Sequence, residues 1–172
     1  MSESIVFRPL VLEDLAKLFV WLTRAHVARW YGKPPSSYAE VVARYASRAE
    51  PGSPIHAHVL LRGGLPVGYA QHYPVSQFPA YAELLGADSS TASMDLLVGD
   101  ASLVGCGLGS QAIRRYVEDV VFADEGFAAC AAGTPEGHEA ARRAFARAGF
   151  QPWKRVEPID GPAEQVLLRS RA

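Results

Sequence analysis

The chain has 172 residues, of which 49% are hydrophobic and 20% are charged, and its formal net charge is -1 at pH 7. This balance is typical of an ordinary globular domain, and the near-neutral charge argues against nucleic acid as a partner, because such binding usually requires a basic footprint. No apolar run reaches the roughly 20 residues that cross a bilayer, so no membrane partner is expected.

The first half of the chain predicts three strands and two helices. Apolar residues recur at helical spacing after Pro9, which ends a first short strand. Ser37 and Glu40 form a capping-box pattern that opens a second helix, and two alternating apolar segments flank a glycine turn. The expected elements are a strand at 5–8, helices at 12–22 and 37–49, and strands at 55–61 and 67–73.

The second half begins with a long connection and then alternates strands with helices. Residues 74–91 contain Pro, Gly and Ser with little periodicity, and connections of that length are often functional. Gly149 is expected to end the last helix, and Asp160-Gly161 to form a turn between the last two strands. The expected elements are strands at 94–98, 127–131, 150–157 and 164–169, and helices at 111–121 and 135–148. With no internal repeat, the pattern predicts one α/β domain over residues 1–172.

Cysteines and histidines give no sign of a metal site or a disulfide framework. The two cysteines, Cys106 and Cys130, have neither the spacing of metal ligands nor that of a disulfide framework. His56 and His58 share one face of an expected strand, but no third metal ligand accompanies them. The acidic start, Met-Ser-Glu-Ser, leads into a strand-like segment and not into the apolar core of a signal peptide. We therefore expect no metal and a cytoplasmic location.

Residues 92–110 form the most informative segment. A short apolar strand with one carboxylate, Asp95, runs into a loop with Gly105, Gly107 and Gly109, and a helical pattern begins at once. Glycines let backbone approach a ligand, and the first amides of a helix lack intrahelical partners. Loop and helix together predict an anion site suited to phosphate. The spacing matches neither a dinucleotide fingerprint nor a P-loop.

The order of these features resembles the GNAT superfamily of acyl-CoA-dependent N-acyltransferases. Over nearly its whole length, the chain is similar to one group within it, the aminoglycoside 6'-N-acetyltransferases. The resemblance implies a single GNAT domain with a mixed, mostly antiparallel sheet of about six to seven strands, splayed at the centre and flanked by helices. The matching pieces are Arg8-Pro9, Glu13–Leu15, Trp21-Leu22, Arg24, His26, Trp30, Pro66–Tyr73, Asp95, Ala101-Ser102, Gly105–Gly109, Ala148–Phe150 and Asp160–Pro162.

The resemblance implies acetyl-CoA as co-substrate. Pantetheine would pair with the backbone of Leu96, Leu97 and Val98, where the Asp95 strand separates from its neighbour. Pyrophosphate would bind amides of the glycine loop, and His138 replaces an Asn that usually lies near the cofactor arm. The loop residues expected to bind it are Gly105, Cys106, Gly107, Leu108, Gly109 and Ser110.

Asp95 is the candidate catalytic residue. Only an uncharged amine can attack a thioester carbonyl, so a carboxylate whose pKa is raised by burial could remove the proton from the substrate ammonium. Alternatively, Asp95 holds a cationic substrate or makes a structural hydrogen bond. The match to the acid that the family carries on this strand favours the catalytic role.

A polycationic aminosugar would require carboxylates and aromatic walls. The resemblance assigns substrate contacts to Trp30, Gln71, Tyr73, Asp95 and Asp160. Taken singly, Trp30 and Tyr73 also fit ordinary core aromatics, and Asp160 fits the first residue of a turn.

Besides His138, three further positions depart from the family pattern. Val104 stands where the superfamily often has Arg or Gln at the head of the pyrophosphate motif. Phe145 stands where many members have a Tyr that can protonate the CoA thiolate. Gly133 stands where the aminoglycoside enzymes carry a substrate-binding Asp, in the loop after the fifth strand. The loss of acids weakens the expectation of aminoglycoside binding more than that of acetyl transfer.

We therefore expect transfer of an acetyl group from acetyl-CoA to a primary amine, by direct attack in a ternary complex. The first candidate acceptor is the 6'-amine of an aminoglycoside, with antibiotic resistance as the associated role. A lysine or hydroxylysine side chain in siderophore assembly, or a polyamine, is the alternative acceptor. A degenerate GNAT domain that binds CoA without turnover is the alternative of a different class. The partner would be a small amine, and the protein a monomer or homodimer.

Overall fold

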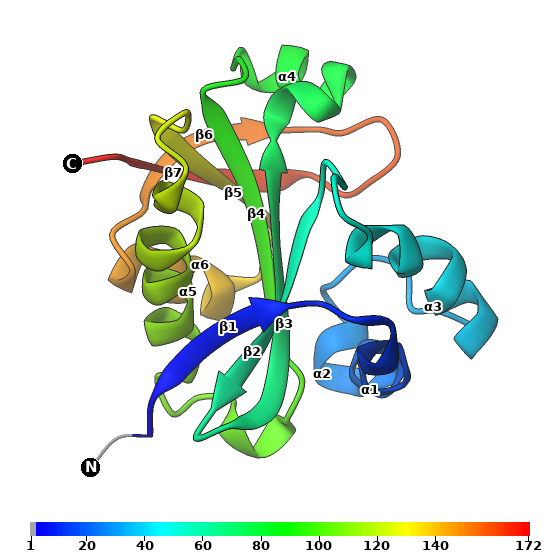
Figure 1. Ribbon diagram of the computed structural model, residues 1–172. Helices are drawn as coiled ribbons and strands as arrows, with labels where there is room; N and C mark the ends of the chain where they lie inside the picture. The colour runs from blue at the N-terminus through cyan, green and yellow to red at the C-terminus, as the bar shows by residue number, and fades with distance from the viewer. Residues whose placement is uncertain (1–2) are drawn as a thin grey trace. The chain divides into compact units, whose positions relative to one another are not determined.

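A computed structural model of the chain describes residues 3–172, and its strands form one seven-stranded sheet (Figure 1). The strand order is β1-β2-β3-β4-β5-β7-β6. The pairs β1/β2, β5/β7 and β6/β7 are antiparallel, whereas β4 and β5 are parallel. The mixed, mostly antiparallel sheet expected from the sequence is confirmed. No helix within residues 3–172 has the length and apolar character needed to cross a membrane.

The chain divides into two compact units. Unit 1 comprises Met1–Gln71 and Leu96–Leu108, and unit 2 comprises His72–Asp95 and Gly109–Ala172. Strands β3 (Leu65–Pro74) and β4 (Thr91–Val98) each contribute residues to both units. The expectation of a single domain over the whole chain remains a prediction.

Unit 1 combines the N-terminal strands with three helices, which gather together in Figure 1. Its helix α1 buries Leu15, Leu18, Trp21 and Leu22. These residues recur every three or four positions, so one apolar stripe faces the core while the other side meets solvent. The elements are β1 (Ile5–Pro9), α1 (Leu15–Thr23), α2 (Ala25–Ala28), α3 (Tyr38–Tyr45), β2 (His56–Arg62) and the first part of β3, with 3-10 turns at Leu12–Asp14, Ala46–Ala49 and Ala101–Leu103.

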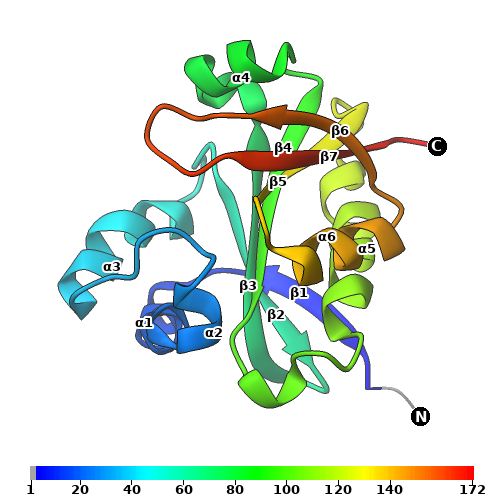
Figure 2. The same ribbon diagram turned by 180° about the vertical axis from the view of Figure 1, so that it is seen from behind.

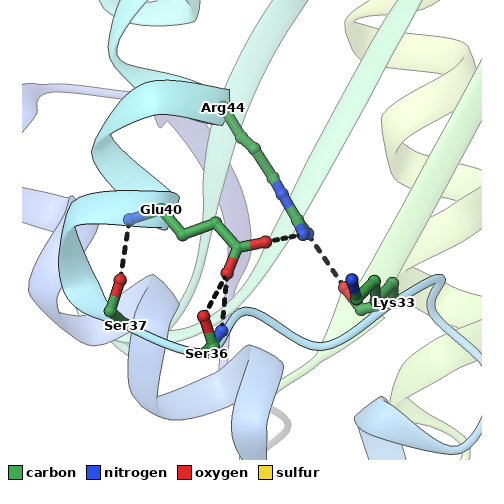
Figure 3. A network of polar contacts seen from close by, with 5 residues as sticks. All are labelled: Lys33, Ser36, Ser37, Glu40 and Arg44. Atoms are coloured by element: carbon green, nitrogen blue, oxygen red, sulfur yellow. Dashed lines mark hydrogen bonds and ion pairs between the residues drawn. The ribbon is translucent and has the colours of Figure 1, made fainter.

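The start of α3 differs in one contact from the expected capping box (Figure 3). The Ser37 hydroxyl accepts a hydrogen bond from the Glu40 amide at 3.2 Å, as expected. The Glu40 carboxylate does not complete the box at Ser37 but accepts from the Ser36 amide and hydroxyl, both at 2.7 Å. It also pairs with Arg44, whose guanidinium donates to the Lys33 carbonyl at 2.9 Å. The carboxylate thus joins the helix to the chain segment before it.

Unit 2 contains the remaining helices and strands. Helices α5 and α6 lie side by side (Figures 1 and 2), and the Arg114 guanidinium of α5 donates to the Arg147 carbonyl of α6 at 2.5 Å. Helix α5 buries Ala112, Ile113 and Tyr116. The elements are the 3-10 turns at Val75–Gln77 and Val121–Ala123, α4 (Pro79–Leu85), the first part of β4, α5 (Leu108–Asp119, which starts in unit 1), β5 (Ala129–Pro135), α6 (Glu139–Arg147), β6 (Gln151–Val156) and β7 (Glu164–Ser170).

The structure corrects two expectations in unit 2. The connection 74–91 is not irregular, because it contains helix α4, which begins at Pro79 and ends before Gly86. Strand β5 runs on to Pro135 and helix α6 starts only at Glu139, so Pro135 ends a strand and does not open a helix. Residues 132–135 pair with β7, and this pairing extends the strand beyond its apolar run.

Replacement of Glu40 by Gln should destabilise the protein at neutral pH and destabilise it less in acid. Hydrogen bonds from the Ser36 amide and hydroxyl, aided by the Arg44 charge, lower the pKa of the Glu40 carboxyl to about 2. The stabilisation is therefore complete above the ordinary pKa near 4.5 and is lost as the pH falls through about 2. In thermal unfolding, the melting temperatures of the two proteins should differ more at pH 7 than at pH 3. Glu50→Gln serves as the control, and an equal gap at both pH values would contradict this role.

Candidate active site

Asp95 lies on β4 beside a buried residue and is itself half-buried. Met94 is 1% exposed, so the alternation along the strand directs Asp95 to the opposite face of the sheet. Strands β4 and β5 pair from Thr91↔Ala129 to Ser93↔Ala131, and both strands continue beyond that register. Two residues beyond Ser93 and Ala131 lie Asp95 and Gly133, which the two-residue period puts on one face.

A second carboxylate reaches the same face from β7. Pro135 pairs with Glu164 and Gly133 pairs with Val166, so Glu164 shares the face of Gly133. The Tyr81 hydroxyl, from helix α4, donates a hydrogen bond to Glu164 Oε2 at 3.1 Å. A Cβ atom built on Gly133 would overlap Glu164 Oε2 and lie 3.0 Å from the Tyr81 oxygen. The Glu164 carboxylate thus fills the space that a side chain at position 133 would take.

Burial and the charge of Asp95 determine how readily the Glu164 carboxyl is protonated. Burial raises the pKa of the Glu164 carboxyl, the Tyr81 hydrogen bond opposes that effect, and the Asp95 charge raises the pKa further. The pKa of the Tyr81 hydroxyl is raised by burial and then by Glu164, Tyr73 and Asp95. Tyr81 therefore remains a neutral donor at physiological pH. The name acidic group is used here for Tyr73, Tyr81, Asp95 and Glu164, because Tyr73 and Asp95 both act on the Tyr81 hydroxyl and Asp95 also acts on Glu164.

In unit 1, side chains and backbone hold the end of β4 in place. The His26 ring donates through Nε2 to the Val98 carbonyl at 2.9 Å, and Arg24 donates to the Gly99 carbonyl at 2.9 Å. A Cβ at Gly68 would overlap the Leu97 carbonyl oxygen, so β3 and β4 approach closely there. Leu96, Leu97 and Val98, expected to pair with pantetheine, are therefore part of a fixed strand end.

The glycine loop follows directly. Gly105 and Gly107 have φ of 82° and 85°, which non-glycine residues rarely adopt, and a Cβ at either would meet no atom within 4 Å. Backbone conformation and not lack of space therefore requires glycine at both positions. Between them, the Cys106 thiol is exposed and donates to the Leu103 carbonyl at 2.8 Å. Helix α5 begins immediately afterwards at Leu108, so its positive dipole end adjoins the loop.

The other predicted site residues occupy several places. In unit 1, the Arg29 guanidinium lies 4.8 Å from the centre of the half-buried Trp30 ring. The buried Gln71 accepts through Oε1 from the Tyr69 hydroxyl at 2.7 Å and from Arg48. In unit 2, Tyr73 packs edge-to-face on Phe78 with ring centres 5.0 Å apart, and Asp160 is exposed in the connection between β6 and β7. His138 is half-buried at the N-cap of α6.

Tyr73 and Asp95 both act electrostatically on Tyr81, and the structure adds to the candidate site Tyr81 and Glu164, which the sequence analysis did not select. Tyr81 lies on the helix that was expected to be an irregular connection. Pro79 and Gly86 at the two ends of that helix were the available signals. Glu164 had no local signal, because its proximity to Gly133 comes from the pairing of β5 with β7.

The chain matches a family model described as "Acetyltransferase (GNAT) domain" over residues 11–158. The chain therefore belongs to the GNAT family, and it is an acetyltransferase that uses acetyl-CoA as its donor.

Individual relatives agree with this assignment. The aminoglycoside N(6')-acetyltransferase type 1 of Klebsiella pneumoniae is 28% identical over 99% of this chain and 86% of its own length. The crystal structure of the aminoglycoside acetyltransferase AAC(6')-Ib with coenzyme A is 26% identical, with a TM-score of 0.84 over 98% of this chain and 95% of that one. The complex of the same enzyme with coenzyme A and kanamycin has a TM-score of 0.82, with the same identity and coverage.

Replacement of Gly68 by Ala should destabilise the protein by about 1–3 kcal/mol, the usual cost of overpacking. The added Cβ would collide with the Leu97 carbonyl, which is backbone and cannot rotate away. Urea unfolding measures the loss. Gly161→Ala is the matched control, because its Cβ would make only an ordinary 3.9 Å contact, and it should change stability by less than about 0.5 kcal/mol. Equal stability of both variants would contradict the close approach of β3 and β4.

Proposed function

We propose that the protein transfers the acetyl group of acetyl-CoA to the 6'-amine of an aminoglycoside. The observation that carries this proposal is the position of Asp95, which directly precedes the strand end and the glycine loop in the chain and belongs to the acidic group. A polycationic acceptor suits such a group, because carboxylates attract ammonium ions and aromatic faces bind them. The similarity to an enzyme crystallised with coenzyme A and kanamycin supports the same acceptor class.

The donor is proposed to bind along β4 and the glycine loop. Leu96, Leu97 and Val98 would pair with pantetheine through backbone groups. The residues Gly105, Cys106, Gly107, Leu108, Gly109 and Ser110 would surround the pyrophosphate. The left-handed glycines and the start of α5 fit this ligand, because glycines let backbone approach an anion closely and the first turn of a helix favours negative charge. His138 remains a further predicted contact.

The proposed reaction is a direct transfer. Asp95 accepts a proton from the acceptor ammonium, and the freed lone pair attacks the thioester carbonyl carbon. Backbone amides on β4 stabilise the negative charge that develops on the carbonyl oxygen. The nitrogen of the resulting tetrahedral intermediate loses its second proton to solvent water, the carbon–sulfur bond breaks, and the thiolate departs with its electron pair. Phe145 packs on Phe150 with ring centres 5.1 Å apart and has no hydroxyl that could protonate the thiolate, so the thiolate takes its proton from water or leaves unprotonated.

Substrate contacts are proposed for Trp30, Gln71, Tyr73, Asp95 and Asp160. Tyr69 and Arg48 hold the carbonyl oxygen of Gln71 and thereby fix the direction of its amide group. Asp160 would contribute only charge, because it is exposed in the connection between strands.

Free thiol released from acetyl-CoA in the presence of kanamycin tests the function. Rapid release with kanamycin supports the proposal. Release only with lysine, hydroxylysine or a polyamine would contradict the acceptor, and no release with any amine would contradict the reaction.

Asp95→Asn should lower kcat by roughly two to four orders of magnitude, which is the usual contribution of a general base. Asn keeps the shape of the side chain but cannot accept the proton, so thermal stability should change little. Asp119→Asn, on the exposed face of α5, is the control and should keep normal activity. An Asp95→Asn enzyme with nearly normal kcat would remove Asp95 from this role.

A further inference from the structure

The Glu164 carboxylate has an unusual position for a charged group. It is half-buried, it lies over the Cα atom of Gly133, and the Tyr81 hydroxyl holds it at 3.1 Å. Any side chain at position 133 would displace it, and loss of Tyr81 would remove the contact that orients it. Helix α4 and strands β5 and β7 therefore cooperate to hold one carboxylate in a fixed place.

Within residues 3–172, no basic side chain forms an ion pair with Glu164. The basic residues on β6 and β7 are bound to other groups, since Arg155 pairs with Glu136 and Arg169 pairs with Glu118. Lys154 donates to the Leu85 carbonyl. The partner of Glu164 is instead the neutral Tyr81 hydroxyl. A half-buried carboxylate without a cation is unfavourable, because a hydroxyl replaces only part of its hydration.

The charge of Asp95 makes the burial of the Glu164 carboxylate without a cation still less favourable. Its charge acts on Glu164 in the same direction as burial, and both groups lie on the same face of the sheet. Two carboxylates that repel each other bind a cation more strongly than either alone, because the cation relieves the repulsion as well. If Asp95 serves the amine that reacts, Glu164 is left for a different positive charge.

We propose that Glu164, held by Tyr81, binds an ammonium group of the acceptor other than the one that is acetylated. Glu164 is thus a specificity-determining residue that favours acceptors with two or more amines. This inference rests on the proposed acetyl transfer to an aminosugar, with Asp95 at the reacting amine.

Two acceptors separate this role from the reaction itself. Kanamycin carries several amines, whereas 6-amino-6-deoxyglucose carries one. Glu164→Gln should lower kcat/KM for kanamycin roughly 10- to 100-fold, mainly through KM, because a charged hydrogen bond is lost. The same variant should change kcat/KM for the monoamine less than about threefold and leave KM for acetyl-CoA unchanged. Turnover by the unaltered enzyme tests the proposed function. The ratio of kcat/KM for kanamycin to kcat/KM for the monoamine tests the role of Glu164.

Two further variants test the same role of Glu164, and a third serves as the control. Gly133→Ala keeps the charge but displaces the carboxylate, so it should reproduce the selective loss on kanamycin. Tyr81→Phe should produce a smaller loss in the same direction. Glu125→Gln, an exposed acid of unit 2, is the charge-matched control and should behave like the unaltered enzyme.

Two outcomes would overturn the proposal. One is an equal loss by Glu164→Gln on both acceptors, and the other is no loss on kanamycin. If the unaltered enzyme released no thiol with either acceptor, calorimetric titration with kanamycin would still decide, since Glu164→Gln must then weaken binding tenfold or more. Equal affinity of the two proteins for kanamycin would refute the role of Glu164.

Discussion

The donor half of the proposed reaction depends on the backbone conformation of one short loop. Gly105 and Gly107 turn the chain through left-handed conformations, and α5 starts at Leu108, so backbone groups and a helix dipole meet at a single point. An anion favoured there needs no charged side chain, which explains why Val104 can occupy a position where the family often has a basic or amide residue. Because backbone groups and not side chains would attract the anion, the side chains of the loop are free to vary.

Chain connectivity then links the donor to the acceptor. The strand end at Leu96–Val98 is fixed by His26 and by the close approach of Gly68, and Asp95 is the residue just before it. In the proposed reaction, Asp95 belongs to the same strand as the backbone that would pair with the donor, and catalysis by proximity requires such a short covalent spacing. In the proposed scheme, Glu164 adds a second negative charge from another strand, so that recognition of the acceptor is separate from its activation by Asp95.

Local signals in the sequence sufficed for the features that are local in the structure. The apolar strand with Asp95, the alternate glycines and the helix after them follow one another in the chain, so period and glycine spacing predicted them. Helix α4 was missed because its apolar stripe is only two turns long and most of its surface is exposed. Glu164 could not be predicted at all, since Gly133 and Glu164 meet through strand pairing across 31 positions. Gly133 was expected in a loop and lies within β5, where its missing side chain makes room for Glu164.

Calorimetric titration of the protein with coenzyme A, and separately with pantetheine, tests most directly whether the glycine loop binds a diphosphate. The account predicts that coenzyme A binds well below millimolar concentration and that pantetheine, which lacks the diphosphate and the phosphorylated adenosine, binds at least tenfold more weakly. Equal affinity for the two ligands, or no heat from coenzyme A at millimolar concentration, would contradict it.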